Sequence, residues 1–284
     1  MHIVVCIKQV PDSAQIRVHP VTNTIMRQGV PSIINPFDLF ALEEAMRLRD
    51  LAGGEVTVLC MGPPMAEDSL RKALAYGADR AILLTDRQFA GSDTLATTFA
   101  LASAIVKIGA TWSEPSIVFT GKQTIDGDTA QVGPGIAKRL NFTQLTYVSR
   151  IVNADSATGV ITVERRAEGG VQILASRLPA LITMLEDTNV MRRGTMADAL
   201  RSARAEVIKW SAVDAGITDA LKCGLRGSPT VVKKVFAPAA REQKAHQLPV
   251  VDRSFDELAE DLMAEIFGRN PAIEGDLIRR AEGL

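Results

Sequence analysis

Residues 120–134, Thr-Gly-Lys-Gln-Thr-Ile-Asp-Gly-Asp-Thr-Ala-Gln-Val-Gly-Pro, combine the side chains and glycines that can hold a charged small molecule. They follow Ser116–Phe119, an apolar run short enough for a buried strand, and lead into residues 130–140, which have the composition of a helix. Gly121 and Gly127 permit positive φ angles in the connecting loop. Three loop side chains can cap the helix, namely Asp126, Asp128 and Thr129. The stretch therefore predicts a strand, a loop and a helix start.

Such a helix start presents free backbone N–H groups and the positive end of the helix dipole, which together stabilise a phosphate. Lys122 adds a positive charge, whereas Asp126 and Asp128 would repel a phosphate unless they cap backbone amides, bind ribose hydroxyls or face water. This combination favours a nucleotide over a simple phosphate. The loop matches neither GxxxxGK(S/T) nor GxGxxG, so the spacing alone leaves an ordinary loop with solvated charges equally open.

The elements that must position this loop alternate between short apolar runs and longer amphipathic stretches. We expect strands at residues 2–7, 56–60, 81–85, 116–120, 145–151 and 181–184. We expect helices at residues 37–51, 66–76, 93–108 and 130–140. Two antiparallel hairpins are also expected, a short one over 15–27 that turns at Thr22-Asn23 and a longer one that pairs 160–166 with 170–176. This order predicts an α/β fold with a doubly wound, mostly parallel sheet covered on both faces.

Open α/β sheets bind ligands beyond the carboxyl ends of their strands, so the residues there are further candidates. Cys6 lies near the end of the first strand, and Met61 turns out of the end of the second. Asn35-Pro36-Phe37-Asp38 supplies a cap, a proline at the first helical position and an acid at the third, which start a helix and can satisfy its amides. A well-capped helix without a ligand is the simpler interpretation of this motif.

A second polar helix start lies at residues 93–97. Asp93 can cap the helix, and Thr94 and Thr97 are three residues apart on a face distinct from the apolar one. Two such hydroxyls can hydrogen-bond a diphosphate, but a plain polar helix surface is the alternative.

Composition excludes several classes of protein. With 284 residues, 46% hydrophobic and 23% charged, the chain can bury a full core as one large domain or a domain with an appendage. A net charge of −1 gives no electrostatic case for nucleic acid or an anionic membrane. Three cysteines without CxxC spacing and three histidines argue against a disulfide framework and a zinc site. Without a signal peptide or an apolar run of about 20 residues, we expect a cytoplasmic protein and no membrane insertion.

The composition changes after residue 190. Residues 187–204 are charged, and residues 220–250 contain glycines and prolines with few periodic apolar positions, which is typical of an extended arm. Residues 257–267 form a short amphipathic helix pattern. An arm and a helix that cannot form a core need a surface to lie on. We therefore expect an α/β nucleotide-binding domain at 1–190, a separate segment at 191–219 and an arm with a helix at 220–284.

Four motifs, in order, resemble the β (small) subunit of electron transfer flavoprotein. They are Val5-Cys6-Ile7-Lys8-Gln9-Val10-Pro11, Asn35-Pro36-Phe37-Asp38 with Ala41-Leu42-Glu43-Glu44-Ala45, Ala73-Leu74-Ala75-Tyr76-Gly77-Ala78-Asp79-Arg80, and residues 121–133. Within this family the chain looks most like the nitrogen-fixation and carnitine-type branch, some of whose members bifurcate electrons. The pointers are Asn23-Thr24, residues 29–34, residues 93–97 and residues 224–230.

The resemblance implies an adenine-nucleotide α-hydrolase-like, Rossmann-like fold and a heterodimer with a large (α) subunit. It implies that FAD, where the conventional branch holds AMP, is surrounded by Cys6, Asn35, Pro36, Phe37, Asp38, Met61, Asp93, Thr94, Thr97, Gly121, Lys122, Gln123, Asp126, Thr129, Ala130, Gln131 and Val132. It further implies NADH or a dehydrogenase as electron donor, and quinone, acyl-CoA dehydrogenase, ferredoxin or flavodoxin as acceptor. Segment 191–219 resembles the family's partner-recognition region, although its Pro-Arg-Tyr-Pro element is here Val190-Met191-Arg192-Arg193.

Two alternatives stay open. One is a conventional small subunit that binds AMP as a structural element. The other is a stand-alone ATP-binding or ATP-hydrolysing domain, whose glycine-rich loop would follow the first strand, where this chain has Lys8-Gln9-Val10-Pro11. Because no Ser-His-Asp, Cys-His or paired-carboxylate constellation is visible, we expect an electron carrier without catalytic side chains.

Overall fold

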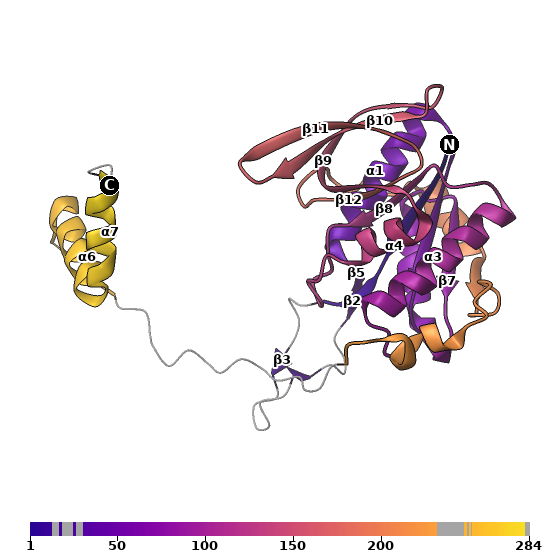
Figure 1. The fold of residues 1–284 in the computed structure, drawn as a ribbon, viewed down its shortest axis with the longest axis horizontal. Coiled ribbons are helices and arrows are strands. Elements are labelled where there is room, and N and C mark those ends of the chain that lie inside the picture. Colours follow the sequence, from indigo (N-terminus) through magenta and orange to yellow (C-terminus); the bar gives the residue numbers. More distant parts are fainter. Residues whose placement is uncertain are drawn as a thin grey trace. The chain divides into compact units, whose positions relative to one another are not determined.

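The computed structural model describes residues 1–12, 17–18, 25–26, 31–231, 247–248, 250 and 252–281. The chain divides into two compact units, Met1–Phe236 and Ala237–Leu284 (Figure 1). The expected turn at Thr22-Asn23, the family pointers at Asn23-Thr24 and Gly29-Val30, and most of the expected arm lie outside the described residues. The two strands of the short hairpin, β3 (Arg17–Val18) and β4 (Ile25–Met26), pair antiparallel as predicted.

The described part of the first unit contains a nine-stranded sheet in the order β11-β10-β9-β12-β8-β1-β6-β7-β13 (Figure 1). Seven strands run parallel: β1 (His2–Ile7), β6 (Glu55–Met61), β7 (Arg80–Leu84), β8 (Ile117–Gly121), β9 (Thr143–Asp155), β12 (Ala180–Met184) and β13 (Val207–Trp210). The remaining two, β10 (Val160–Ala167) and β11 (Gly170–Arg177), form the predicted antiparallel hairpin that turns at Glu168-Gly169. A small ladder of β2 (Gln9–Pro11) and β5 (Ser32–Ile34), which the sequence did not indicate, extends the path from β1.

Strand β1 marks the point where the strand order reverses. The chain continues from β1 to β6 and β7 on one side, and then crosses to β8 and β12 on the other side. In such a doubly wound sheet, a crevice opens outside the carboxyl ends of the two strands at the reversal. Here these strands are β1 and β8, and the loop at 120–134 follows β8 directly.

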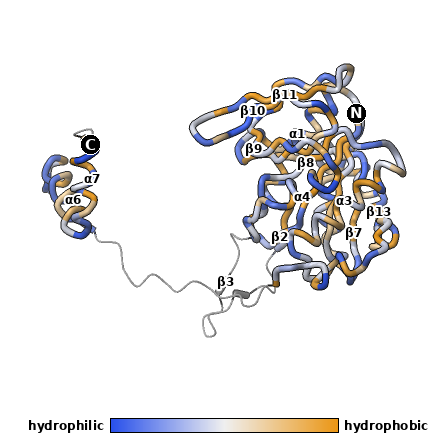
Figure 2. The backbone as a smooth tube through the Cα atoms, in the orientation of Figure 1, coloured by the Kyte–Doolittle hydropathy of each residue, from blue (hydrophilic) through white to orange (hydrophobic). Residues whose placement is uncertain are grey.

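Helices cover both faces of the sheet, as predicted. Helices α1 (Pro36–Ala52) and α2 (Glu67–Tyr76) share one core cluster with Ile3 and Val5 of β1, and α5 (Met196–Arg204) packs against α2. Helices α3 (Thr94–Thr111) and α4 (Val132–Leu140) share the other cluster with Val4 and Cys6. Alternate residues of β1 therefore face opposite layers, and the hydrophobic stretches of the chain gather in these central strands (Figure 2). The α/β fold expected from the sequence is confirmed.

Helix α3 is long and apolar enough, by length and composition alone, to cross a membrane, and it is the one such helix in the described residues. Ala100, Ile105 and Ile108 of this helix are buried against the sheet. The apolar composition is therefore that of a core helix.

Strand β11 is the outermost strand at one end of the described sheet. Its eight residues are mostly exposed, including Val171 and Ile173 at 64% and 66%. At the other end, β13 has four residues and carries Lys209. The two edges thus differ in length and in apolar character.

The described part of the second unit consists of α6 (Phe255–Arg269) and α7 (Pro271–Ala281). The expected helix at 257–267 lies within α6, which begins with a capping box of Ser254 and Glu257. Neither helix has a buried residue, and both mix hydrophilic and hydrophobic stretches (Figure 2). Phe255 is 91% exposed, so this pair of helices presents apolar surface.

Candidate functional site

The start of α1 joins the carboxyl ends of β1 and β8. Asp38 is buried, and its carboxylate accepts hydrogen bonds from the backbone N–H of Lys8 at 2.7 Å and of Gly121 at 3.1 Å. Burial raises the pKa of the Asp38 carboxyl to about 7, against the two amide donors, which favour its charged form. Asp38 therefore links the backbone directly after β1 to the last residue of β8, on the two sides of the crevice.

Asn35 holds the polar loop instead of capping its own helix. Its Nδ2 donates to the carbonyl oxygen of Gln123 at 2.9 Å, and its Oδ1 accepts from the N–H of Ile125 at 3.2 Å. The predicted side-chain cap of α1 by Asn35 is wrong, because both polar atoms of the amide are used by the loop. Pro36 occupies the first helical position, as predicted.

Gly121 is needed for close approach, and neither it nor Gly127 uses the positive φ that glycine permits. A Cβ at Gly121 would lie 2.6 Å from Asp38 Oδ1, 2.6 Å from Phe37 Cβ and 2.7 Å from the Phe37 carbonyl carbon. The positive φ angles of the loop occur instead at Asp128 (51°) and Ala130 (53°). A left-handed alanine is strained by roughly 1–2 kcal/mol, so the surrounding structure must enforce this turn.

The amides at this turn have no hydrogen-bond acceptor among the residues that the structure describes. Helix α4 begins at Val132, with Gln131 as its N-cap residue and no side-chain cap. Within the described part of the chain, the five backbone N–H groups of residues 129–133 donate no hydrogen bond. Consecutive N–H groups in left- and right-handed turns form a concave anion-binding site, to which the dipole of α4 adds.

The expected caps of α4 are wrong because two of the three side chains are engaged elsewhere. Both Asp126 oxygens accept from Lys8 Nζ, at 2.7 and 2.8 Å, and Asp128 accepts from Gln123 Nε2 at 2.8 Å. Thr129 has no side-chain hydrogen bond within the described residues. Partial burial opposes ionisation of Asp126, but Lys8 keeps the pKa of Asp126 below its ordinary value. An anion at residues 129–133 would therefore meet a neutralised Asp126.

Lys122 is held away from solvent by its neighbours. Its Nζ donates to Glu186 Oε2 at 3.2 Å and lies 5.1 Å from the centre of the Phe37 ring. Part of the lysine charge is thus balanced by Glu186, which lies just beyond β12. No local sequence pattern indicates this pairing, because 64 residues separate the partners.

The start of α3 lies beside the start of α4. Asp93 caps α3 as predicted, because its Oδ1 accepts from the N–H of Leu95 at 2.9 Å and of Ala96 at 3.1 Å. The Thr94 hydroxyl donates to Gln131 Oε1 at 2.9 Å. This bond brings two predicted site residues together, and Thr97 follows one turn further along α3.

The other predicted residues lie on the same edge of the sheet. Cys6 is near the carboxyl end of β1, on the face covered by α3 and α4, and burial raises the pKa of its thiol well above the ordinary value. Met61 ends β6. Lys8 was missed as a site residue, although its position directly after β1 is a signal that could have identified it.

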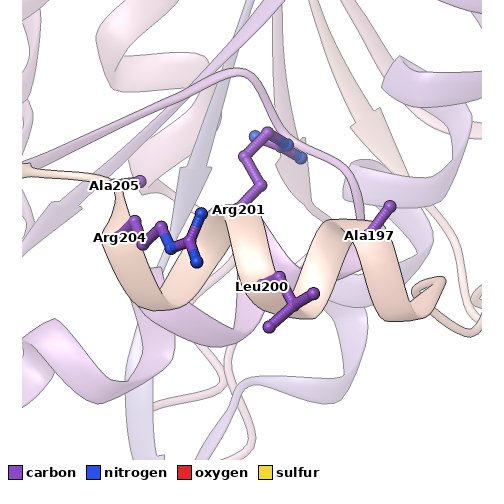
Figure 3. Close-up of a pocket in the computed structure, with 5 residues that line it drawn as sticks. All are labelled: Ala197, Leu200, Arg201, Arg204 and Ala205. Carbon is purple, nitrogen blue, oxygen red and sulfur yellow. The ribbon is translucent and has the colours of Figure 1, made fainter.

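A surface hollow lies away from this edge of the sheet. An open hollow of about 600 Å³ lies along α5, lined by Ala197, Leu200, Arg201, Arg204 and Ala205 (Figure 3). Arg201 and Leu200 extend to opposite sides of the helix, and Arg201 donates to the carbonyl oxygens of Leu74 and Ala78. No group of three or more His, Cys, Asp or Glu suited to a metal ion occurs among the described residues.

The reversal of strand order at β1 and the polar loops at its carboxyl end define a doubly wound α/β domain with one ligand edge. The family described as "Electron transfer flavoprotein domain" matches residues 22–215. The chain is 72% identical over 283 residues to "Protein FixA" of Azorhizobium caulinodans, covering 100% of both chains. It is 70% identical over 277 residues to "Protein FixA" of Sinorhizobium fredii, covering 98% of this chain and 97% of that one.

A more distant relative is "Electron transfer flavoprotein subunit beta" of Clostridium acetobutylicum, which is 45% identical over 266 residues, covering 94% of this chain and 98% of that one. The chain therefore belongs to the electron transfer flavoprotein family, as a β-type subunit of the nitrogen-fixation kind. The family resemblance drawn from the sequence motifs is confirmed.

Proposed function

We propose that this chain binds FAD at the carboxyl edge of β1 and β8 and, paired with a large subunit, carries electrons from NADH or a dehydrogenase to acceptors. The acceptors implied by the resemblance are quinone, acyl-CoA dehydrogenase, and ferredoxin or flavodoxin, the last two through electron bifurcation. The observation that supports this most is the row of five backbone N–H groups at residues 129–133, which have no partner among the described residues. Their arrangement suits the pyrophosphate of an adenine dinucleotide.

The surrounding residues fit that ligand in charge and in rigidity. Lys8 neutralises Asp126, so this loop carboxylate does not oppose a phosphate. Asn35 and Asp38 hold the loop by three hydrogen bonds, at Gly121, Gln123 and Ile125, and Asp38 also ties it to Lys8, which restricts the loop before a ligand arrives. Such preorganisation raises affinity because less conformational entropy is lost on binding.

The proposed division of roles among the residues follows from these contacts. The amides of Thr129, Ala130, Gln131, Val132 and Gly133 would bind the phosphates. The hydroxyl of Thr97 would add a hydrogen bond from α3, while the Thr94 hydroxyl, which donates to Gln131 Oε1, would orient Gln131 beside them. Bound FAD would supply the electron-transfer chemistry, while the protein supplies binding, orientation and electrostatics. No side chain of this chain is proposed as a catalytic acid, base or nucleophile.

The second unit supports the proposed pairing with a large subunit. Helices α6 and α7 bury none of their described residues, and a helix pair of this size gains too little from internal packing to be stable alone. We infer that the large subunit covers them. We propose partner recognition for residues 191–219, where Met196 and Leu200 of α5 are 76% and 54% exposed beside Arg204.

Counting the nucleotides of the co-expressed, purified heterodimer tests this proposal. Close to two FAD per heterodimer is the expected result. One FAD with one AMP would contradict FAD in this chain and favour the conventional small subunit, since AMP can use the same amide row. ATP turnover by the isolated chain would favour the stand-alone ATP-hydrolysing domain, and none is expected.

A further inference from the structure

The segment 219–230 folds back onto the turn that leads into α3. It contains two short helical turns, η4 (Ala220–Lys222) and η5 (Gly224–Gly227). The N–H of Gly224 donates to Ser92 Oγ at 3.1 Å, and a Cβ at this glycine would lie 2.3 Å from the carbonyl oxygen of Gln88. The contact is therefore close and depends on a glycine at position 224.

Ser228 and Thr230 attach this segment to Asp93. Ser228 is only 9% exposed, and its Oγ accepts from the N–H of Asp93 at 2.8 Å and donates to the carbonyl oxygen of Gly224 at 2.7 Å. The N–H and Oγ of Thr230 both donate to Asp93 Oδ2, at 3.1 and 2.8 Å. We call these contacts of Ser228 and Thr230 with Asp93 the Asp93 clasp.

The two oxygens of Asp93 thus serve two different segments. Oδ1 caps α3, while Oδ2 binds Thr230. Burial opposes ionisation, but the hydrogen bonds from Ala96 and Thr230 keep the pKa of Asp93 below its ordinary value. The carboxylate is charged at neutral pH, and bonds to a charged acceptor are about twice as strong as neutral ones.

A continuous path of bonded residues leads from the clasp to the free amides. Thr94 follows Asp93 directly, its hydroxyl donates to Gln131, and Gln131 is part of the row at residues 129–133. A shift of Asp93 would move Thr94 and release Gln131. Positions of this kind affect ligand affinity without touching the ligand.

We propose that Ser228 and Thr230 are positioning residues for the nucleotide, acting through Asp93 and Thr94 on Gln131. This inference rests on the proposed nucleotide site, and it adds a dependence of that site on a segment about 100 residues away in the sequence. If the clasp only fastened residues 219–230 to the first unit, its loss would lower stability and leave affinity unchanged.

Two substitutions at one position separate these possibilities. Thr230→Val removes the hydroxyl and keeps the shape and the backbone N–H, whereas Thr230→Ser keeps the hydroxyl. Thr111→Val is the matched control, because the Thr111 hydroxyl bonds only the carbonyl oxygen of Lys107 at the far end of the same helix. Calorimetric titration of the full-length chain with FAD and with AMP measures affinity, and hydrogen exchange at Leu95 and Ala96 measures the cap.

We expect Thr230→Val to bind both nucleotides about 5- to 10-fold more weakly, with faster exchange at Leu95 and Ala96. This is less than the full effect of one lost hydrogen bond to a charged acceptor, because the backbone N–H of Thr230 still binds Asp93. Thr230→Ser and Thr111→Val should bind as the unmodified chain does. Equal affinity of Thr230→Val and the unmodified chain would overturn the positioning role alone. If the unmodified chain bound neither FAD nor AMP, the proposed site and this inference would both fail.

Discussion

Helices α3 and α4 start side by side at the carboxyl edge of the sheet, but their first amides differ in how they are satisfied. At α3, Asp93 caps two amides and is itself held by Ser228 and Thr230. At α4, no side chain caps the helix, and the turn before it contains a strained alanine. The first helix start is therefore satisfied by side chains of this chain, whereas the second has N–H donors with no acceptor among the described residues.

The largest expected effect comes from displacing the loop that leads to α4. Gly121→Ala places a methyl group against the Phe37 backbone and Asp38, so we expect a loss of about 2–3 kcal/mol in the free energy of unfolding. Urea denaturation followed by the fluorescence of the stacked Trp112 and Trp210 measures it. Gly127→Ala is the control, because its methyl group would lie at an ordinary 3.4 Å from Thr124 and its φ is not positive. Equal losses in both variants would contradict the close approach at Gly121.

A second pair of variants compares the two helix starts directly. Asp93→Ala removes a cap and should cost about 1–2 kcal/mol, whereas Gln131→Ala removes no cap and should cost under about 0.5 kcal/mol. Both values come from urea denaturation under the same conditions. A larger cost at Gln131 than at Asp93 would reverse the comparison.

The third prediction concerns Asp38, which supports the α4 loop. Because burial raises the pKa of Asp38 to about 7 in the folded chain, the folded state holds a proton more tightly than the unfolded state between about pH 4 and pH 7. The contribution of Asp38 to stability is therefore present at low pH and decreases as pH rises through that window, by at most about 1.4 kcal/mol per pH unit.

Asp38→Asn removes the titrating group. From pH 5 to pH 7 the unmodified chain should therefore lose stability relative to this variant. Measuring both proteins cancels the opposite contributions of carboxyls whose pKa is lowered, such as Asp126. A difference that is constant with pH would exclude titration of Asp38 in this range.

The smallest effect is expected from Lys8. Its pair with Asp126 is largely exposed, so Lys8→Gln should change the free energy of unfolding by under about 0.5 kcal/mol. The same change leaves Asp126 uncompensated beside the amide row, and AMP should bind about threefold more weakly at low salt, with a smaller effect at 1 M salt. Lys138→Gln, at the other end of α4, is the control. A loss of AMP affinity that is the same at low salt and at 1 M salt would argue against an electrostatic role for Lys8.

The sequence predicted the elements at this edge better than their contacts. Local patterns predicted the strand before residue 121, the helix after Asp93 and the cap by Asp93. These features depend on residues that are close together in the sequence. Asn35 binds residues 88 and 90 positions away, Asp126 binds a residue 118 positions away, and Lys122 binds one 64 positions away. The orientation of these side chains therefore depends on the fold and not on the local sequence. The same reason explains why Asp126 does not cap α4, since a side chain bound by a distant partner is no longer available to its own helix, whereas Asp128 is bound by nearby Gln123.

The unequal edges of the sheet have a practical consequence for handling the protein. The outer strand β11 exposes Val171 and Ile173 and has no strand on its outer side among the described residues, so its backbone groups are open to an extended segment, whereas the short opposite edge carries a lysine. Isolated chains are therefore expected to associate along β11 as concentration rises. Production alongside a companion subunit, or a lysine introduced on that strand, should keep them dispersed.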